Sequence, residues 1–239
     1  ATLEHDTDNG TFNSLVQVDS DTYALAYSGS SNDGFISTFT ISSSGAITAV
    51  KTQSLGNNLE HDTVQGYYNS LVQVDADTYA LAYSGSDFDG FISTFTISSD
   101  GTTITEVATL EHDTDNGTFN SLVQVDSDTY ALAYSGSDFD GFISTFTISS
   151  DGTTITEVAT LEHDTDNGTF NSLVQVDADT YALAYSGSGD DGFISTFTIS
   201  SDGTTITEVA TLEHDTDNGT FNSLVQVDAD TYALAYSGS

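Results

Sequence analysis

Apolar and polar residues alternate along most of the chain, in short runs rich in Val, Ile, Thr, Tyr and Phe. In one representative stretch the pattern predicts four strands, at residues 120–125 (NSLVQV), 129–135 (TYALAYS), 142–149 (FISTFTIS) and 154–163 (TITEVATLEH). These residue types fit a pleated, partly buried surface. The chain has no Pro, and no segment of useful length has helical periodicity. The sequence therefore predicts an all-β protein.

The connections between these strands are of two kinds. Residues 126–128 (DSD) and 150–152 (SDG) are tight turns, which predicts two antiparallel hairpins. Residues 113–118 (DTDNGT) and 136–141 (GSDFDG) are longer. Because antiparallel strands alternate in direction, both longer loops are expected at the same end of the sheet.

The second predicted strand carries large residues on one face and small residues on the other. Tyr130, Leu132 and Tyr134 alternate with Ala131 and Ala133. The third strand has apolar side chains on both faces as well. A single four-stranded sheet cannot bury both faces, so these strands predict sheets that pack on one another.

The pattern is repeated along the whole chain, which we interpret as a single repeat domain over residues 1–239. The phrase LEHDTDNGTFNSLVQVDSDTYALAYSGS recurs with small changes, at intervals of 56, 51, 51 and 51 residues. Repeats of this length are typical of propellers, solenoids and arrays. The copies begin at Leu3, Leu59, Leu110, Leu161 and Leu212.

Five units of about 50 residues resemble, in number and length, a five-bladed β-propeller of the tachylectin type. The resemblance carries no shared sequence motif, since the chain has no Trp. It implies one four-stranded blade per repeat. An elongated β-solenoid and a string of small sandwiches are the structural alternatives.

The fifth copy ends before its third strand. It lacks the counterparts of residues 138–158, so the closing blade is incomplete in this sequence. We expect either that the natural chain is longer or that another chain fills the gap. In the second case the last strand would pair head-to-tail with a copy of the protein, through the side chains of Tyr232, Leu234 and Tyr236.

Charge narrows the range of partners. The chain has 37 acidic residues and one basic residue, Lys51, and a formal net charge of -36. Such a chain repels nucleic acid and anionic membrane surfaces, and salt, divalent cations or a cationic partner would offset its charge. No apolar run is long enough for membrane insertion. The acidic, Lys-poor, Cys-free composition suits a secreted or cell-surface protein of a prokaryote, with a halophilic setting as one context.

The acidic loops are candidate cation sites. Hard cations such as Ca²⁺ bind several oxygen ligands on flexible loops, and the longer loops supply Asp, Asn and Gly. The alternative is that these are ordinary turn residues on a solvated surface. The second copy has Val64 in place of one carboxylate. The candidate ligands are Asp113, Asp115, Asn116, Asp138, Asp140, Asp164, Asp166, Asp190 and Asp191.

The five histidines lie in LEHD segments, where neighbouring side chains alternate between faces of a strand, so we do not expect a histidine metal site. We also expect no catalytic site, because near-identical copies produce rings of like residues and catalysis needs different residues in one place. The chain is therefore predicted not to be an enzyme.

Two functions remain. The first is a structural or adhesive extracellular module that assembles with itself and is stabilised by cations. The second is a multivalent, lectin-like protein whose aromatic side chains stack on sugars, with Phe119, Tyr134 and Phe139 as candidates. The alternative for these three aromatics is ordinary core packing.

Overall fold

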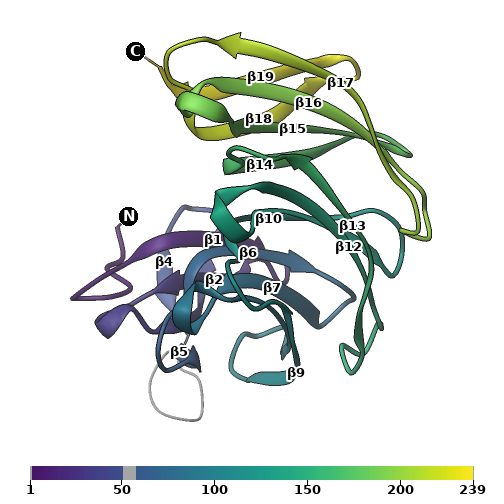
Figure 1. Ribbon diagram of the computed structural model, residues 1–239. Helices are drawn as coiled ribbons and strands as arrows, with labels where there is room; N and C mark the ends of the chain where they lie inside the picture. Colours follow the sequence, from purple (N-terminus) through teal and green to yellow (C-terminus); the bar gives the residue numbers. More distant parts are fainter. Residues whose placement is uncertain (1, 51–57, 239) are drawn as a thin grey trace. The chain divides into compact units, whose positions relative to one another are not determined.

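The computed structural model of the protein describes residues 2–50 and 58–238 (Figure 1). Lys51 lies outside the described residues. Nineteen strands and four short 3₁₀ turns make up the described secondary structure, which confirms the all-β prediction. No helix among the described residues is long and apolar enough to cross a membrane.

The strands form sheets that follow the repeats. The first sheet contains β1 (Thr11–Gln17), β2 (Thr22–Ser28), β3 (Gly34–Ile41), β4 (Ile47–Ala49) and β5 (Asn58–Asp62), with β4 and β5 both paired to β3. The second contains β6 (Tyr67–Gln73), β7 (Thr78–Ser84), β8 (Gly90–Ile97) and β9 (Ile104–Asp113).

The later repeats give three more sheets. The third contains β10 (Thr118–Gln124), β11 (Thr129–Ser135), β12 (Gly141–Ile148) and β13 (Ile155–Asp164). The fourth contains β14 (Thr169–Asp177), β15 (Thr180–Ser186), β16 (Gly192–Ile199) and β17 (Ile206–Asp215). The fifth has only β18 (Thr220–Asp228) and β19 (Thr231–Ser237).

A 3₁₀ turn joins the second and third strands of each four- or five-stranded sheet. The four turns are η1 (Ser30–Asn32), η2 (Ser86–Phe88), η3 (Ser137–Phe139) and η4 (Ser188–Asp190). The sequence predicted a loop here without regular structure.

The predicted strands of the third copy are confirmed within one or two residues. The strand at 129–135 has the predicted bounds, and the third and fourth strands are displaced by one residue. The first strand starts at Thr118, two residues earlier than predicted, because a bulge between Thr118 and Ser121 extends the pairing with β11. Phe119 lies in this bulge with a φ of 53°.

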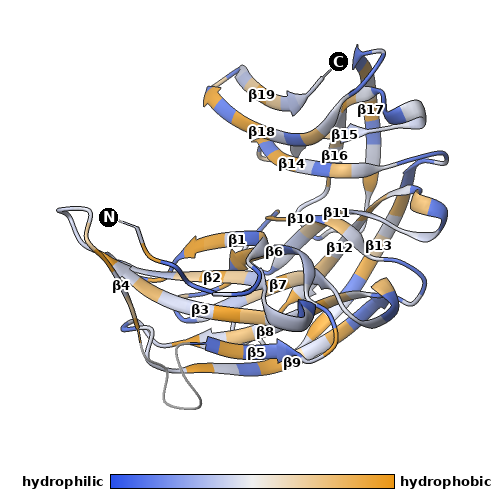
Figure 2. Ribbon diagram, turned by 90° about the vertical axis from the view of Figure 1, so that its left-hand side faces the viewer, coloured by the Kyte–Doolittle hydropathy of each residue, from blue (hydrophilic) through white to orange (hydrophobic). Residues whose placement is uncertain are grey.

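Burial of both faces of the second strand is confirmed. In β15, Tyr181, Leu183 and Tyr185 are buried on one face, and Ala182 and Ala184 on the other. Figure 2 shows how hydrophobic and hydrophilic residues are distributed along the strands. The equivalent strands β2, β7 and β11 are buried in the same way, whereas β19 is mostly exposed.

The described chain divides into two compact units, residues 2–50 and 58–112 with 149–155, and residues 113–148 with 156–238. Within the second unit, β14 packs against β10 and β18. The hydroxyl of Ser121 accepts a hydrogen bond from Leu173 N (3.0 Å), and Ser172 accepts one from Leu224 N (2.9 Å). The first unit repeats this contact between Ser14 and Leu71 N (2.9 Å). Within each unit the first strands of successive sheets are thus neighbours. In the four-stranded sheets the strand that carries LEHD lies at the opposite edge from the first strand.

Aromatic residues of the bulges also lie against one another. The ring centroids of Phe119 and Phe170 are 4.6 Å apart, and those of Phe170 and Phe221 are 4.5 Å apart. In the first unit Phe12 and Tyr68 are 4.5 Å apart. These contacts connect neighbouring sheets within each unit.

The five-bladed description is confirmed only in part. Repeated four-stranded antiparallel sheets are present, but β18 and β19 pair only with each other among the described strands. The closing sheet is therefore open, and a count of five blades stays a prediction.

Candidate functional site

The turn η3 exposes an aromatic side chain. The Phe139 N–H donates to the Gly136 carbonyl (3.1 Å), and Asp140 N–H donates to the Ser137 carbonyl (3.1 Å). Asp138 and Phe139 have φ values of 56° and 67°, in the left-handed region that non-glycine residues rarely occupy. Phe139 is 55% exposed. A strained backbone that presents a large apolar ring to solvent is typical of a functional position.

The loop before β14 lies beside this turn. The Asp164 carboxylate accepts hydrogen bonds from the N–H groups of Asp166 (2.9 Å) and Asn167 (3.2 Å). Gly168 N–H donates to the carbonyl of Phe139 (2.8 Å). The loop is therefore attached directly to the residue that carries the exposed ring.

The turn η4 completes the site. The Asn167 side-chain amide donates to the Gly187 carbonyl (3.1 Å), at the start of this turn. Gly189 and Asp190 have φ values of 76° and 67°. These bonds place η4 on the other side of Asn167 from η3.

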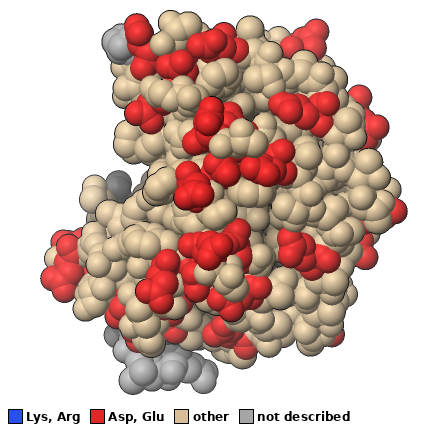
Figure 3. Space-filling view, in the orientation of Figure 1, with Lys and Arg blue, Asp and Glu red and all other residues tan. Residues whose placement is uncertain are grey.

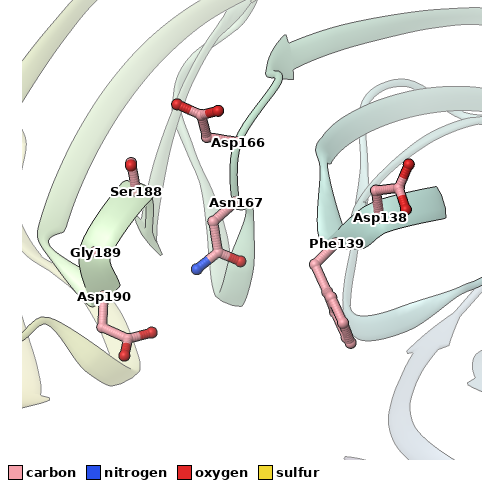
Figure 4. A pocket seen from close by; sticks show the side chains of 7 residues that line it. All are labelled: Asp138, Phe139, Asp166, Asn167, Ser188, Gly189 and Asp190. Carbon is pink, nitrogen blue, oxygen red and sulfur yellow. The ribbon is translucent and has the colours of Figure 1, made fainter.

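Together the three segments form an open pocket of about 490 Å³ (Figure 4). In Figure 4 the Phe139 ring and the Asp190 carboxylate extend in the same direction, on either side of Asn167. The pocket is lined by Asp138, Phe139, Asp166, Asn167, Ser188, Gly189 and Asp190. The predicted meeting of the two kinds of longer loop is confirmed in this unit.

The chemistry of the pocket is that of an acceptor-rich surface beside an aromatic ring. Three carboxylates and an amide oxygen can accept hydrogen bonds from ligand hydroxyl groups. No Lys or Arg occurs among the described residues, and Figure 3 shows Asp and Glu spread over the visible face. An anionic ligand would find no cationic partner in this pocket.

The repeats differ at the positions that line the pocket. The residues equivalent to Phe139 are Asn32 in the first copy, Phe88 in the second and Asp190 in the fourth. The second copy has Val64 and Gln65 where the fourth has the pair Asp166 and Asn167. Outside these loop tips the second to fifth copies are almost identical, whereas the first copy also differs over residues 44–58.

Of the three predicted stacking residues, only Phe139 lies in the pocket. Tyr134 is 3% exposed and its ring stacks on Phe142 with centroids 5.6 Å apart, so its prediction as a ligand-stacking residue is wrong. The alternation of β11 points Tyr134 into the core. Phe119 is half-buried and packs on Phe170, which fits the alternative of structural packing.

Most of the predicted metal ligands either form hydrogen bonds within their own turns or line the pocket. Among the described residues, no group of three or more His, Asp or Glu side chains is arranged to hold a metal ion. Asp113 and Asp164 accept backbone N–H groups of their own turns. The carbonyls of Asp140 and Asp191 accept hydrogen bonds from Gly136 and Gly187. Asp138, Asp166 and Asp190 line the pocket.

The histidines of the LEHD strands are packing residues. His163 lies edge-on to Tyr185 (4.8 Å) and Phe197 (5.7 Å). Burial lowers the pKa of His61 to about 3 and that of His163 to about 4. For His163, the nearby carboxylates of Asp164 and Glu208 offset part of this effect. Both imidazoles are therefore neutral near pH 7.

A smaller open pocket of about 290 Å³ lies in the first unit, around Glu4, His5, Asp6, Tyr27 and Asn58. It resembles the first pocket in its carboxylates. No exposed aromatic ring in a left-handed turn lines it. The pocket at Phe139 is therefore the stronger candidate.

Comparison with known proteins identifies the type of fold but no family. No protein family model matches the chain, and no curated protein matches it in sequence. Solved structures do match. A protein from Bacteroides uniformis assigned as a 6-phosphogluconolactonase is 12% identical, with a TM-score of 0.67 over 90% of this chain and 61% of its own.

Two glycosidase structures are also similar. An α-L-arabinofuranosidase from Lactobacillus brevis is 12% identical, with a TM-score of 0.55 over 95% of this chain and 82% of its own. The NanB sialidase from Streptococcus pneumoniae is 12% identical, with a TM-score of 0.58 over 85% of this chain and 32% of its own. The chain spans less than two thirds of the lactonase and sialidase chains. At these identities the likeness shows a propeller-type all-β fold.

These structures correct the prediction that the chain is not an enzyme. The neighbours are mostly enzymes, namely lactonase, sialidase and arabinofuranosidase. The copies differ at the loop tips, so unlike residues from neighbouring repeats do meet in one pocket. The unlike tripeptides after GS (SND, DFD, DFD and GDD) were the signal in the sequence that could have located the pocket. The fold that the chain shares with these proteins is propeller-type and all-β.

Proposed function

We propose that the protein binds carbohydrate in the pocket around Phe139. The observation that carries this proposal is the exposed Phe139 ring, held at a left-handed φ beside Asn167 and three carboxylates. Sugars present apolar C–H faces that stack on aromatic rings and hydroxyl groups that donate to acceptors. The pocket offers both features in one place.

The similar structures support a carbohydrate-related role over the structural or adhesive module that we expected. Their names include a sialidase, an arabinofuranosidase and, from Bifidobacterium bifidum, a protein assigned as an exo-β-1,3-galactanase. A role in glycan recognition agrees with a secreted or cell-surface location, which we propose from the acidic, Cys-free composition.

A glycan array followed by calorimetry with the best ligand tests the proposal. We expect Phe139→Ala to weaken binding about fivefold, as the loss of one stacked aromatic contact of about 1 kcal/mol would. The control is Asp126→Asn, in the exposed turn between β10 and β11, which should bind as the parent does. Analysis of the ligand after incubation detects any cleavage. Absence of glycan binding, or equal binding by Phe139→Ala, would overturn the proposal.

A further inference from the structure

The pocket around Phe139 combines an aromatic ring with negative charge and has no positive charge to balance it. Asp138, Asp166 and Asp190 come from three separate segments, and all three side chains are exposed. The second unit, which contains the pocket, has no Lys or Arg in its sequence. A neutral sugar needs hydrogen-bond acceptors, but it does not need three charges.

The hydrogen bonds of the pocket leave its carboxylates turned to solvent. The turn at residues 164–167 uses the Asp164 carboxylate, and the backbone carbonyls of Phe139 and Asp190 accept from Gly168 (2.8 Å) and Gly219 (2.8 Å). The bonds that hold the loops thus come from backbone groups, from Asp164 outside the pocket, and from the Asn167 side-chain amide, which donates to the Gly187 carbonyl (3.1 Å). The lining carboxylates are left to act on a ligand.

The Phe139 ring also favours a positively charged ligand. A cation within about 6 Å of an aromatic ring centroid is attracted by the negative face of the ring. In Figure 4 the Phe139 ring and the Asp190 carboxylate extend the same way, with Asn167 between them. An ammonium group on a sugar ring could contact a carboxylate while the C–H face of the same ring lies on Phe139.

We propose that the preferred ligand of this pocket is a cationic amino sugar, such as a glucosamine oligomer. This inference rests on the proposed carbohydrate-binding function and names the chemical class of its ligand. Anionic sugars would be repelled by the pocket and by the net charge of -36. Neutral sugars would bind through stacking and hydroxyl contacts alone.

The test compares three tetramers by calorimetry: glucosamine, N-acetylglucosamine and galacturonic acid, at a pH where the glucosamine amines are protonated. We expect the glucosamine tetramer to bind at least tenfold more tightly than the N-acetylated one in 20 mM salt. Near 0.5 M salt this ratio should approach one, because screening weakens charge contacts. Binding of galacturonate should not be detected.

Two double variants distinguish binding in this pocket from general attraction of a cation to an acidic protein. Asp138→Asn with Asp190→Asn should reduce the preference for glucosamine to less than threefold and leave N-acetylglucosamine binding in place. Asp126→Asn with Asp128→Asn removes the same charge at the other end of the sheet and should keep the full preference. If both double variants reduce the preference equally, the attraction is nonspecific and the inference is wrong.

The failures of the two proposals are distinct. Equal binding of neutral and cationic tetramers, lost in Phe139→Ala, would overturn the amino-sugar inference and support carbohydrate binding. Tight binding of galacturonate would overturn the inference in the same way. If no sugar tested binds, on the array or in calorimetry, both proposals fail.

Discussion

His163 packs so closely against Gly141 that a Cβ atom at Gly141 would lie 2.6 Å from the imidazole Cε1. The same relationship recurs between His214 and Gly192, where the distance would be 2.5 Å. Each LEHD histidine in these pairs covers the first residue of the strand beside it. Sequence repetition thus produces a repeated steric contact.

Substitution Gly141→Ala should therefore destabilise the protein. No positive φ requires glycine at Gly141, so the cost is steric, and overpacking of this kind is worth about 1–3 kcal/mol. Denaturant unfolding of the variant measures the loss. In a His163→Ala background the same substitution should cost less, although Gly168 still lies near. An equal cost in both backgrounds would contradict the packing argument.

Acid should destabilise the protein through its buried histidines. His61 and His163 have folded-state pKa values of about 3 and 4, below the usual 6.5, because burial disfavours the charged ring. The unfolded chain therefore takes up more protons below pH 6.5. Stability is complete above pH 6.5 and should fall by up to about 1.4 kcal/mol per pH unit for each such histidine as the pH drops towards 4.

Unfolding free energies at pH 7, 6, 5 and 4.5 check this expectation. His163→Phe keeps an aromatic ring and should reduce the pH slope, whereas His5→Gln, at an exposed position, should reproduce the parent slope. Carboxylate titration acts in all three proteins alike, so the difference in slope isolates the buried ring. An unchanged slope in His163→Phe is the contrary result.

Phe139→Asn should keep or raise stability by up to about 1 kcal/mol while it weakens glycan binding. Asn tolerates the left-handed region better than Phe, and Asn32 occupies the equivalent position with a φ of 72°. Phe170→Asn is the matched control, because Phe170 also has a positive φ (52°) but packs between Phe119 and Phe221. The control should lose stability; a loss of equal size in both variants would show that Phe139 is a structural residue.

Salt should raise the melting temperature. With a net charge of -36, self-repulsion weakens as ions screen it. Melting curves between 20 mM and 1 M NaCl measure the effect, and a flat response would count against it. CaCl₂ at matched ionic strength separates screening from binding. A larger shift with CaCl₂ would support the predicted cation binding by the acidic loops.

Strand β19 should mediate association of the protein with itself. Tyr236 is 41% exposed, whereas its counterpart Tyr185 is 2% exposed, and Tyr232 and Leu234 are only partly buried. Pairing of backbone groups with another chain would cover this surface. Light scattering coupled to size exclusion should show species heavier than the 25.2 kDa monomer.

Lysine substitutions in β19 test whether the protein associates through this strand. Ala233→Lys with Ala235→Lys should shift the protein towards the monomer, because charged residues block pairing at a sheet edge. Ala178→Lys, in the exposed turn before β15, adds the same type of charge elsewhere and should leave assembly unchanged. A monomeric parent protein would refute the prediction.

The alternating sequence by itself determined the strands and their sheets. Apolar side chains on both faces of TYALAYS required a layer on each side, and β15 is buried in that way. Short turns such as residues 126–128 determined the hairpins. These are local consequences of side-chain alternation and turn chemistry, so one repeat was sufficient to predict them.

The site was decided by tertiary structure. Phe139 and Tyr134 are both aromatic residues near the same loop, and the sequence treated them alike. Only the left-handed turn at residues 138–139 turned one ring to solvent, while strand alternation buried the other. The pocket also needs Asn167 and Asp190. The backbone bond from Gly168 to Phe139 and the bond from the Asn167 side-chain amide to the Gly187 carbonyl bring these separate segments together. Contacts between residues so far apart in the chain depend on how sheets pack, which no local pattern contains.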